Sequence, residues 1–231
     1  MSENDKTQEP LRYERKFLIT DYSHKEMEQM IKFHPACFSE IFHERQINNI
    51  YFDTPGFQNY YDNVEGSPDR TKVRIRWYDA LFGVVERPIL EYKIKKGLLG
   101  KKASFPLMPF SMDKNFSAEE VSKAINSETI PAFVKDEVRS LQPVLLNSYT
   151  RKYYLSADKN FRVTIDHHLQ YYRIGNTGNL FLKPSVDHAS TVMELKYDSS
   201  FESEAKEVGR AFPVAMTKNS KYLTGLERIF L

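Results

Sequence analysis

The chain has 231 residues, 41% of them hydrophobic and 13% aromatic, which is enough apolar material for one large core or two small ones. Its one cysteine, Cys37, excludes an intramolecular disulfide and a cysteine-based zinc cluster, and it suits a reducing compartment. The 33 basic and 31 acidic residues nearly balance, so we expect no binding of nucleic acid to a basic surface. Residues 1–10 are polar and no apolar run approaches the roughly 18 residues of a membrane span, which predicts a cytoplasmic protein with a disordered start.

The hydrophobic pattern predicts many strands and few, short helices. A first strand over 11–19 precedes a helix that opens with a capping box at Ser23 and ends before Pro35. A second capping box, at Ser117, opens a helical insertion at about 117–141. The other predicted elements are, in chain order, strands over 48–52, 72–78 and 89–96, a loop over 97–110, strands over 147–156, 161–174 and 191–198, and helices over 201–212 and 215–229.

Five of the strand-length stretches carry polar or charged residues at alternate positions. Because side chains alternate across a strand, each stretch has one charged face and one apolar face. The charged faces could be exposed to solvent, or they could line the interior of a barrel that holds a polyanion. The number of strands with a charged face favours closure of the sheet into a barrel. We therefore expect an α+β, mainly β fold in a single domain over 11–231. The stretches are Arg12/Glu14/Lys16, Lys72/Arg74/Arg76, Glu91/Lys93/Lys95, Arg162/Thr164/Asp166 and Glu194/Lys196.

Arg74 and Arg76 are the strongest candidates for binding an anion. Like charges two positions apart in an aromatic strand crowd each other unless an anion relieves them. Two guanidinium groups on one strand face lie about 7 Å apart and can each hold phosphate oxygens bidentately. A carboxylate also recurs two residues before a lysine, at Glu14, Glu91 and Glu194, so the set could hold a divalent cation as well as phosphate.

The segments YERKF, IYFDTP, VRIRWY, EYKIK, SYTRKYY, RVTIDHHL, MELKY and TKNSKY, in this order, resemble the VTC-type polyphosphate polymerase domain. That domain belongs to the triphosphate tunnel metalloenzyme superfamily, whose other branch is the CYTH group of adenylate cyclases and thiamine triphosphatases. The resemblance implies an eight-stranded antiparallel closed tunnel that binds tri- or polyphosphate with a divalent metal. It also implies a phosphotransferase that builds polyphosphate from the terminal phosphate of ATP.

The resemblance assigns roles residue by residue. The CYTH branch opens with two glutamates and a lysine at alternate positions, but here Arg12 replaces the first glutamate, which disfavours a second metal and favours the VTC branch. The family's basic tunnel positions fall on Lys16, Arg74, Arg76, Lys93, Arg151, Lys218 and Lys221, and its metal-binding glutamate falls on Glu194. Arg162 and Asp166 match a further pattern of the family.

From these matches and the alternating pattern we expect three groups of site residues. Catalysis would use cations that neutralise charge on the transferring group, phosphate would be bound by further cations, and glutamates would bind Mn²⁺ or Mg²⁺. Lys218 and Lys221, three apart on the predicted last helix, should share one face. The groups are Lys16, Arg74, Arg76, Lys93 and Lys196 for catalysis, Arg12, Arg151, Arg162, Lys218 and Lys221 for phosphate, and Glu194 with Glu14 for the metal.

Three functions stay open at this stage. Extension of polyphosphate from ATP needs cations and a metal but no general base, because the end of the polymer is already ionised. A tripolyphosphatase or nucleoside triphosphatase would need a water molecule activated by a metal or a carboxylate. Glu14, Glu91 or Asp166 could be that carboxylate. A non-catalytic polyphosphate-binding module is the third possibility, and a polymerase that exports its product would need a separate membrane partner.

Two further motifs are assigned no function. His167 and His168 are adjacent in a predicted strand, so they should face opposite ways and cannot share one metal; we interpret them as structural. The segment GLLGKK lacks the spacing of a Walker phosphate loop.

Overall fold

The computed structural model describes residues 12–96, 99–126, 130–175, 179 and 181–230, and the disorder predicted for residues 1–10 lies outside them. The chain divides into two compact units. The first unit comprises residues 1–44, 151–167 and 189–219, and the second comprises residues 45–150, 168–188 and 220–231. The assignment of one domain over 11–231 stays a prediction.

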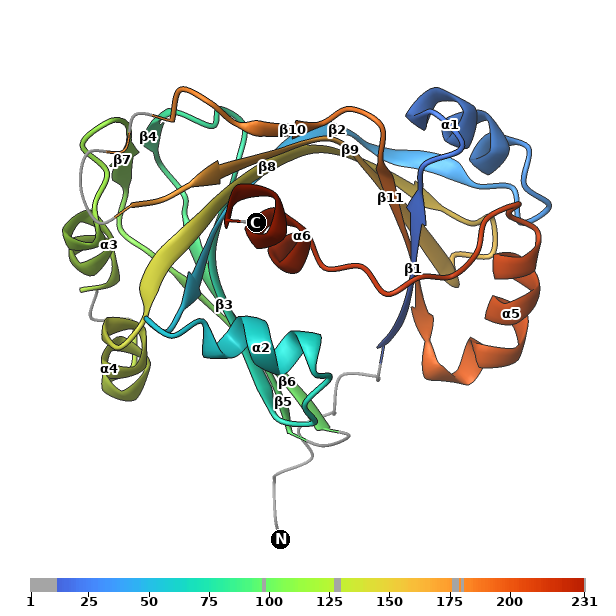
Figure 1. The fold of residues 1–231 in the computed structure, drawn as a ribbon. Coiled ribbons are helices and arrows are strands. Elements are labelled where there is room, and N and C mark those ends of the chain that lie inside the picture. Colours follow the sequence, from blue (N-terminus) through green and yellow to red (C-terminus); the bar gives the residue numbers. More distant parts are fainter. Residues whose placement is uncertain (1–11, 97–98, 127–129, 176–178, 180, 231) are drawn as a thin grey trace, which may run out of the picture. The chain divides into compact units, whose positions relative to one another are not determined.

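Over the described residues, the fold is a mainly antiparallel sheet with six α-helices (Figure 1). Its eight principal strands are hydrogen-bonded in the order β1-β11-β9-β8-β2-β3-β5-β6, with β10 added to β9, and β4 and β7 form a separate pair. Eight principal strands agree with the predicted number; closure of the sheet into a tunnel stays a prediction. Three long strands run from one unit into the other: β2 (Ser39–Asp53), β8 (Gln142–Leu155) and β9 (Phe161–Arg173).

In the first unit, two helices cover the apolar face of the strands. The helix α1 starts with the predicted capping box, since Ser23 and Glu26 bond each other's backbone, and its Met27 and Ile31 are fully buried one turn apart. They pack with apolar side chains of β1 and β11 and with Ala205 of α5 in one core cluster. The elements of this unit are β1 (Arg12–Ile19), α1 (His24–Lys32), β11 (Thr191–Asp198), the short 3₁₀ helix η1 (Ser199–Phe201) and α5 (Glu202–Arg210).

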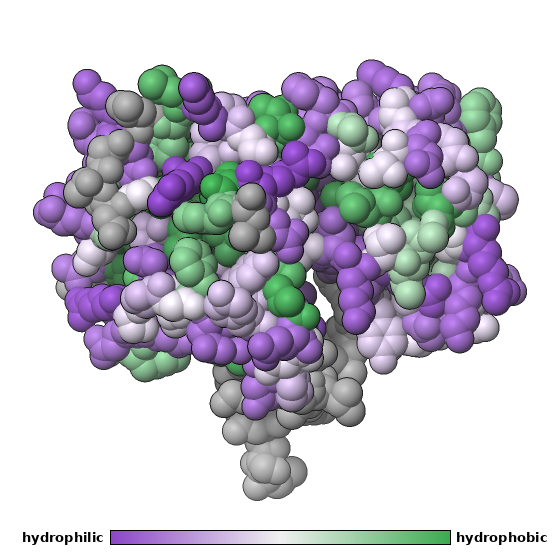
Figure 2. Space-filling view, in the orientation of Figure 1, coloured by the Kyte–Doolittle hydropathy of each residue, from purple (hydrophilic) through white to green (hydrophobic). Residues whose placement is uncertain are grey.

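In the second unit, β3 and β5 bury Val73, Ile75 and Leu90 against the helical insertion, whose Val121 and Val134 belong to the same core. The elements of this unit are α2 (Gln58–Val64), β3 (Arg70–Tyr78), β4 (Gly83–Val85), β5 (Ile89–Lys96), β6 (Leu99–Pro106), β7 (Phe110–Met112), α3 (Ala118–Ile125), α4 (Ala132–Arg139), β10 (Ser185–Asp187) and α6 (Lys221–Phe230). Hydrophilic residues cover most of the surface visible in Figure 2.

Most of the predicted elements are present, but the predicted loop over 97–110 is wrong. It contains strand β6, which pairs with β5 and places Ala103 and Phe105 against the core. Glycine and proline at its ends hid this alternation. Helix α3 forms as predicted, but the capping box does not, since Glu120 binds Lys123 instead of the backbone at Ser117.

The last helix is shorter than predicted and begins at Lys221. The segment before it lies along β1, where the Thr217 amide donates to Lys16 O at 2.8 Å and its hydroxyl accepts from the Leu18 amide at 2.7 Å. Tertiary hydrogen bonds therefore hold residues 215–220 out of the helix.

A buried carboxylate joins α2 to α6. Asp53 is fully buried at the end of β2 and accepts hydrogen bonds from the amides of Asn59 and Tyr60 in α2, at 2.9 and 3.0 Å. It also accepts from the hydroxyl of Tyr222 in α6. Because α2 has no side-chain cap of its own, Asp53 supplies the anion that favours a helix N-terminus. The sequence pattern missed α2 because this cap comes from a different element.

Helix α6 packs so closely against β8 and β9 that Gly225 leaves no room for a side chain. A Cβ there would lie 2.5 Å from Leu145 Cδ2 and 2.7 Å from Tyr171 Cδ1, and both neighbours are buried. We expect Gly225→Ala to lower the free energy of unfolding by about 1–2 kcal/mol, because the destabilisation by overpacking exceeds the stabilisation from the higher helix propensity of alanine. Urea denaturation measures this. The control is Gly56→Ala, where nothing lies within 4 Å; equal effects at both positions would contradict the close approach.

Candidate functional site

The first unit gathers lysines and glutamates on the predicted charged face of β1 and β11. The antiparallel register sets Glu14 opposite Lys196 and Lys16 opposite Glu194. Lys16 Nζ lies 3.0 Å from Glu14 and 3.7 Å from Glu194, while Lys196 Nζ lies 3.0 Å from Glu194 and 3.8 Å from Glu14. The two carboxylates and two ammonium groups therefore form one continuous charged cluster.

The buried edge of this cluster is built on Arg151 of β8. Its Nη2 donates to Asp166 Oδ2 at 2.6 Å and to Glu194 Oε2 at 3.4 Å, and its Nε also donates to Asp166. All three residues are less than 8% exposed. A single guanidinium thus pairs with two buried carboxylates. Burying these carboxylates without a cation would cost free energy of folding.

The pKa of Glu14 is lowered. Burial is the largest influence and raises it, as does the nearby Glu194 carboxylate, but Lys196 and Lys16 together outweigh both. Glu14 is therefore a carboxylate at neutral pH and a weak proton acceptor. Together with Arg151 and Asp166, the cluster of the first unit contains as many carboxylates as cations.

The second unit carries a different, cation-rich cluster on β3, β5 and β6. Arg74 is paired with Glu91 in the register of β3 and β5, and its Nε and Nη2 donate to Glu91 Oε2 at 2.7 and 2.6 Å. Arg76 Nη1 lies 3.7 Å from the same oxygen and Lys102 Nζ lies 3.1 Å from Oε1. Three cations therefore share one carboxylate.

Neutral side chains hold both arginines in place. Arg74 Nη1 donates to the Tyr51 hydroxyl at 3.3 Å, and Arg76 Nε donates to Asn49 Oδ1 at 3.0 Å. Asn49 is fully buried and donates in turn to Asn147 Oδ1 at 3.2 Å. These contacts orient the guanidinium groups and neutralise none of their charge, so the positive excess of the cluster stays available to an anion.

More lysines lie on neighbouring positions of the second unit. Lys72 and Lys93 face each other in the register, and Lys93 also faces Lys102. Lys221, only 9% exposed, places its Nζ 4.8 Å from the centre of the Tyr149 ring, a cation–π contact.

The remaining predicted site residues are placed differently. Lys218 is exposed in the segment before α6, so the predicted face shared with Lys221 on one helix is wrong. Arg162 is exposed on β9 opposite Lys196, and within the described ranges no ion pair is recorded for it. Arg12 is paired with Asp198 through the backbone, and its side chain lies outside the described part.

Three neutral or basic contributors were missed. Lys102 lay in the segment interpreted as a loop, and the polar pair Asn48 and Asn49 in a strand otherwise rich in apolar residues was the available signal for Asn49. Tyr51 lies in the segment IYFDTP, in which no residue was predicted to belong to the site, and its hydroxyl contacts Arg74.

The adjacent histidines of β9 also depart from the prediction. His168 has a left-handed backbone with φ of 52°, which interrupts the alternation, so His167 and His168 do not face opposite ways. One ring nitrogen of His167 and one of His168 lie within 4.8 Å of each other.

The family model of the VTC domain matches residues 11–230. The chain belongs to the VTC domain family. A search of curated proteins found no match for this VTC domain. Among its described residues, none of the helices has the length and apolar character required to cross a membrane.

Two solved structures share the fold of the VTC domain. One is a candidate adenylate cyclase from Vibrio parahaemolyticus, 11% identical, with a TM-score of 0.51 over 94% of this chain and 99% of that one. The other is the candidate adenylyl cyclase HpAC1 from Hippeastrum, with a dominant triphosphatase activity of its own, 16% identical, with a TM-score of 0.53 over 96% of this chain and 98% of that one. The predicted relation to the triphosphate tunnel fold is confirmed.

The shared carboxylate of the second unit should make stability depend on pH. Burial acts first and raises the pKa of Glu91, but Arg74 and then Arg76 outweigh it and lower the pKa to about 2. A lowered carboxylate pKa stabilises the fold above the unfolded-state value of about 4.5, and this contribution disappears as the pH falls towards 2. We expect Glu91 to contribute about 3 kcal/mol across that interval.

Urea denaturation between about pH 5 and pH 2.5 measures this contribution. Glu91→Gln should reduce the pH dependence that the parent shows by about 3 kcal/mol across this interval, whereas Glu119→Gln, at an exposed glutamate of α3, should retain it. Parallel pH profiles for the parent and Glu91→Gln would show that the ion pairs with Arg74 and Arg76 contribute nothing.

Proposed function

We propose that this VTC domain is a metal-dependent phosphotransferase that binds tri- or polyphosphate and moves the terminal phosphoryl group of ATP to inorganic polyphosphate. The observation that carries the proposal is the excess of cations around Glu91, where Arg74, Arg76 and Lys102 share one carboxylate. Phosphoryl transfer depends mainly on positioning and on neutralising the charge of phosphate oxygens. The membership in the VTC family and the tunnel-type fold support this class of reaction.

The two arginines of β3 have the principal binding role in this proposal. A guanidinium has five N–H donors, and in the described part of the chain Arg76 makes one hydrogen bond and one longer ion pair. It can therefore offer donors to a phosphate without giving up its orientation by Asn49. Lys93 and Lys221 add positive charge in the same unit, and Lys16 and Lys196 add it in the first unit.

The carboxylates of the first unit suit a divalent metal. Glu14 and Glu194 offer carboxylate oxygens, which Mg²⁺ and Mn²⁺ prefer, and Lys16 and Lys196 between them show that the pair already attracts cations. When bound, such an ion would neutralise phosphate oxygens and polarise the transferring group. Arg151 would hold the Glu194 carboxylate in place.

Weak bases favour transfer to polyphosphate over hydrolysis. The pKa values of Glu14 and Glu91 are lowered, and Asp166 is bound by Arg151, so each is a poor acceptor of a proton from water. An ionised phosphate end needs no such acceptor. Triphosphatase activity is the second candidate, because the Hippeastrum protein of the same fold has it. The cytoplasmic location and the separate membrane partner stay predictions.

Product analysis tests the proposal directly. Purified protein incubated with ATP and Mn²⁺, with and without a short polyphosphate primer, should yield long polyphosphate and ADP. Gel electrophoresis of the polymer and a phosphate assay separate the outcomes. Release of free phosphate without polymer would establish the triphosphatase instead, and tight binding of tripolyphosphate without turnover would establish a binding module.

Two substitutions should separate binding from turnover. Glu194→Gln removes the proposed metal ligand and should reduce turnover at least about a hundredfold while changing the affinity for tripolyphosphate little. Arg74→Ala should weaken tripolyphosphate binding about tenfold or more, the usual effect of losing a charged hydrogen bond. Calorimetry and the polymer assay measure the two quantities.

The control for charge alone is Arg139→Ala, an exposed arginine of α4 paired with Asp136, which should leave both quantities unchanged. Arg74→Lys tests whether the planar fork matters or only the charge. Parent-like affinity in Arg74→Ala, with the fold intact by circular dichroism, would remove Arg74 from the site.

A further inference from the structure

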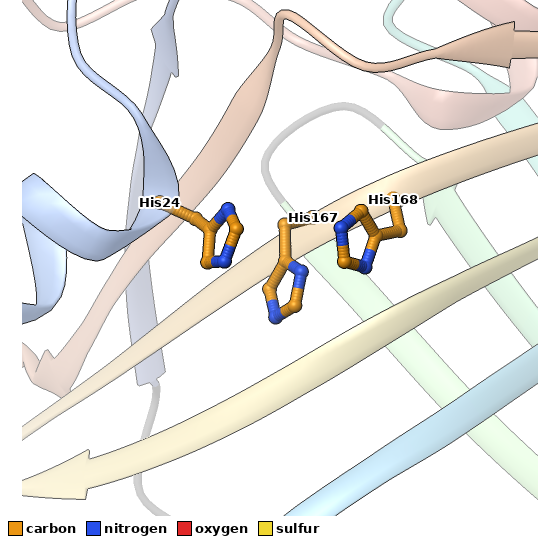
Figure 3. Close-up of side chains that lie close together, drawn as sticks. All are labelled: His24, His167 and His168. Atoms are coloured by element: carbon orange, nitrogen blue, oxygen red, sulfur yellow. The ribbon is translucent and has the colours of Figure 1, made fainter.

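Two histidines of the first unit stack where α1 meets β9. The rings of His24, the first residue of α1, and His167 of β9 are parallel within 5°, with centroids 4.3 Å apart (Figure 3). His167 is 3% exposed and His24 is partly exposed. Because strand positions alternate, His167 lies on the face of Ile165 in the apolar core, opposite the face of Asp166. This pair is therefore separate from the cluster of Glu14 and Glu194.

Carboxylates border the histidine pair. Glu44 of β2 places Oε1 3.9 Å from His167 Nε2. Glu28 lies one turn after His24 on α1 and is 6% exposed; its Oε1 is buried and has no hydrogen-bond partner in the described part of the chain. Lys152 Nζ lies 2.9 Å from Glu28 and 3.5 Å from Glu44. The carboxylates beside the imidazoles thus already hold a cation.

We propose that His24 and His167, together with Glu44, bind a Zn²⁺-class ion. Imidazole nitrogens with one carboxylate suit Zn²⁺, Ni²⁺ or Cu²⁺, whereas Mg²⁺ and Mn²⁺ favour oxygen-only sites such as the Glu14 and Glu194 pair. Zn–N bonds of about 2.0–2.1 Å require donor atoms roughly 3.3 Å apart in a tetrahedron.

Metal binding requires a rotation of these side chains. The stacked rings must turn so that their nitrogens converge, and the partly exposed His24 has room to rotate towards the buried His167. The ion would join the first turn of α1 to β9 and β2. It would therefore stabilise the first unit and take no part in phosphoryl transfer.

Zinc binding to the stripped protein tests this site. Protein treated with EDTA and returned to excess Mg²⁺ is titrated with Zn²⁺ by calorimetry, and Co²⁺ is added separately to record the visible absorption of a tetrahedral site. We expect one Zn²⁺ site that excess Mg²⁺ does not displace, tetrahedral Co²⁺ absorption, and a rise in melting temperature with Zn²⁺.

Variants at positions with some exposure avoid the risk of unfolding. His24→Ala and Glu44→Gln should each weaken Zn²⁺ binding at least about tenfold and abolish the rise in melting temperature, since each removes a proposed ligand. His188→Ala, an exposed histidine outside the cluster, should bind as the parent does. Absence of Zn²⁺ binding in the parent, or parent-like binding in both His24→Ala and Glu44→Gln, would overturn the proposal.

Discussion

Side-chain alternation across paired strands fixes the positions of the strand residues that form the two charged clusters. In β3 the rows Val73/Ile75 and Arg74/Arg76 point to opposite faces, and burial of the first row in the core determines the direction of the second. A slip of one residue in the pairing with β5 would bury two arginines in the apolar core and expose two apolar residues. The core therefore specifies the charged cluster, and the cluster's register cannot vary while the core persists.

The two units distribute charge in different ways. The carboxylates that could hold a hard cation belong to the first unit, where Arg151, Lys16 and Lys196 balance them. The excess positive charge belongs to the second unit, where cations gather around Glu91. A polyanion is bound by cationic side chains, whereas its counter-cation is bound by carboxylates. In this protein the two kinds of side chain form separate clusters.

Period-two alternation made much of this predictable from the sequence. The faces of β1, β3, β9 and β11, the helices near Ser23 and Ser117, and the pairing of Glu194 with lysine follow from local pattern. What failed depends on contacts distant in sequence: β6 exists because β5 pairs with it, and Lys218 is held against β1. The left-handed backbone of His168 interrupts the alternation, and no glycine or proline at that position indicated this in the sequence.

The buried Asp53 has a consequence for motion in the second unit. The Asp53 carboxylate accepts hydrogen bonds from the amides of Asn59 and Tyr60 and from the hydroxyl of Tyr222. Tyr222 lies 169 residues from Asp53 in the chain. Departure of α6 would leave Asp53 less well satisfied and loosen the start of α2, so the two helices should open as one cooperative event. Amide exchange at the start of α2 would then report how often the far end of the chain, with Lys221, leaves its place.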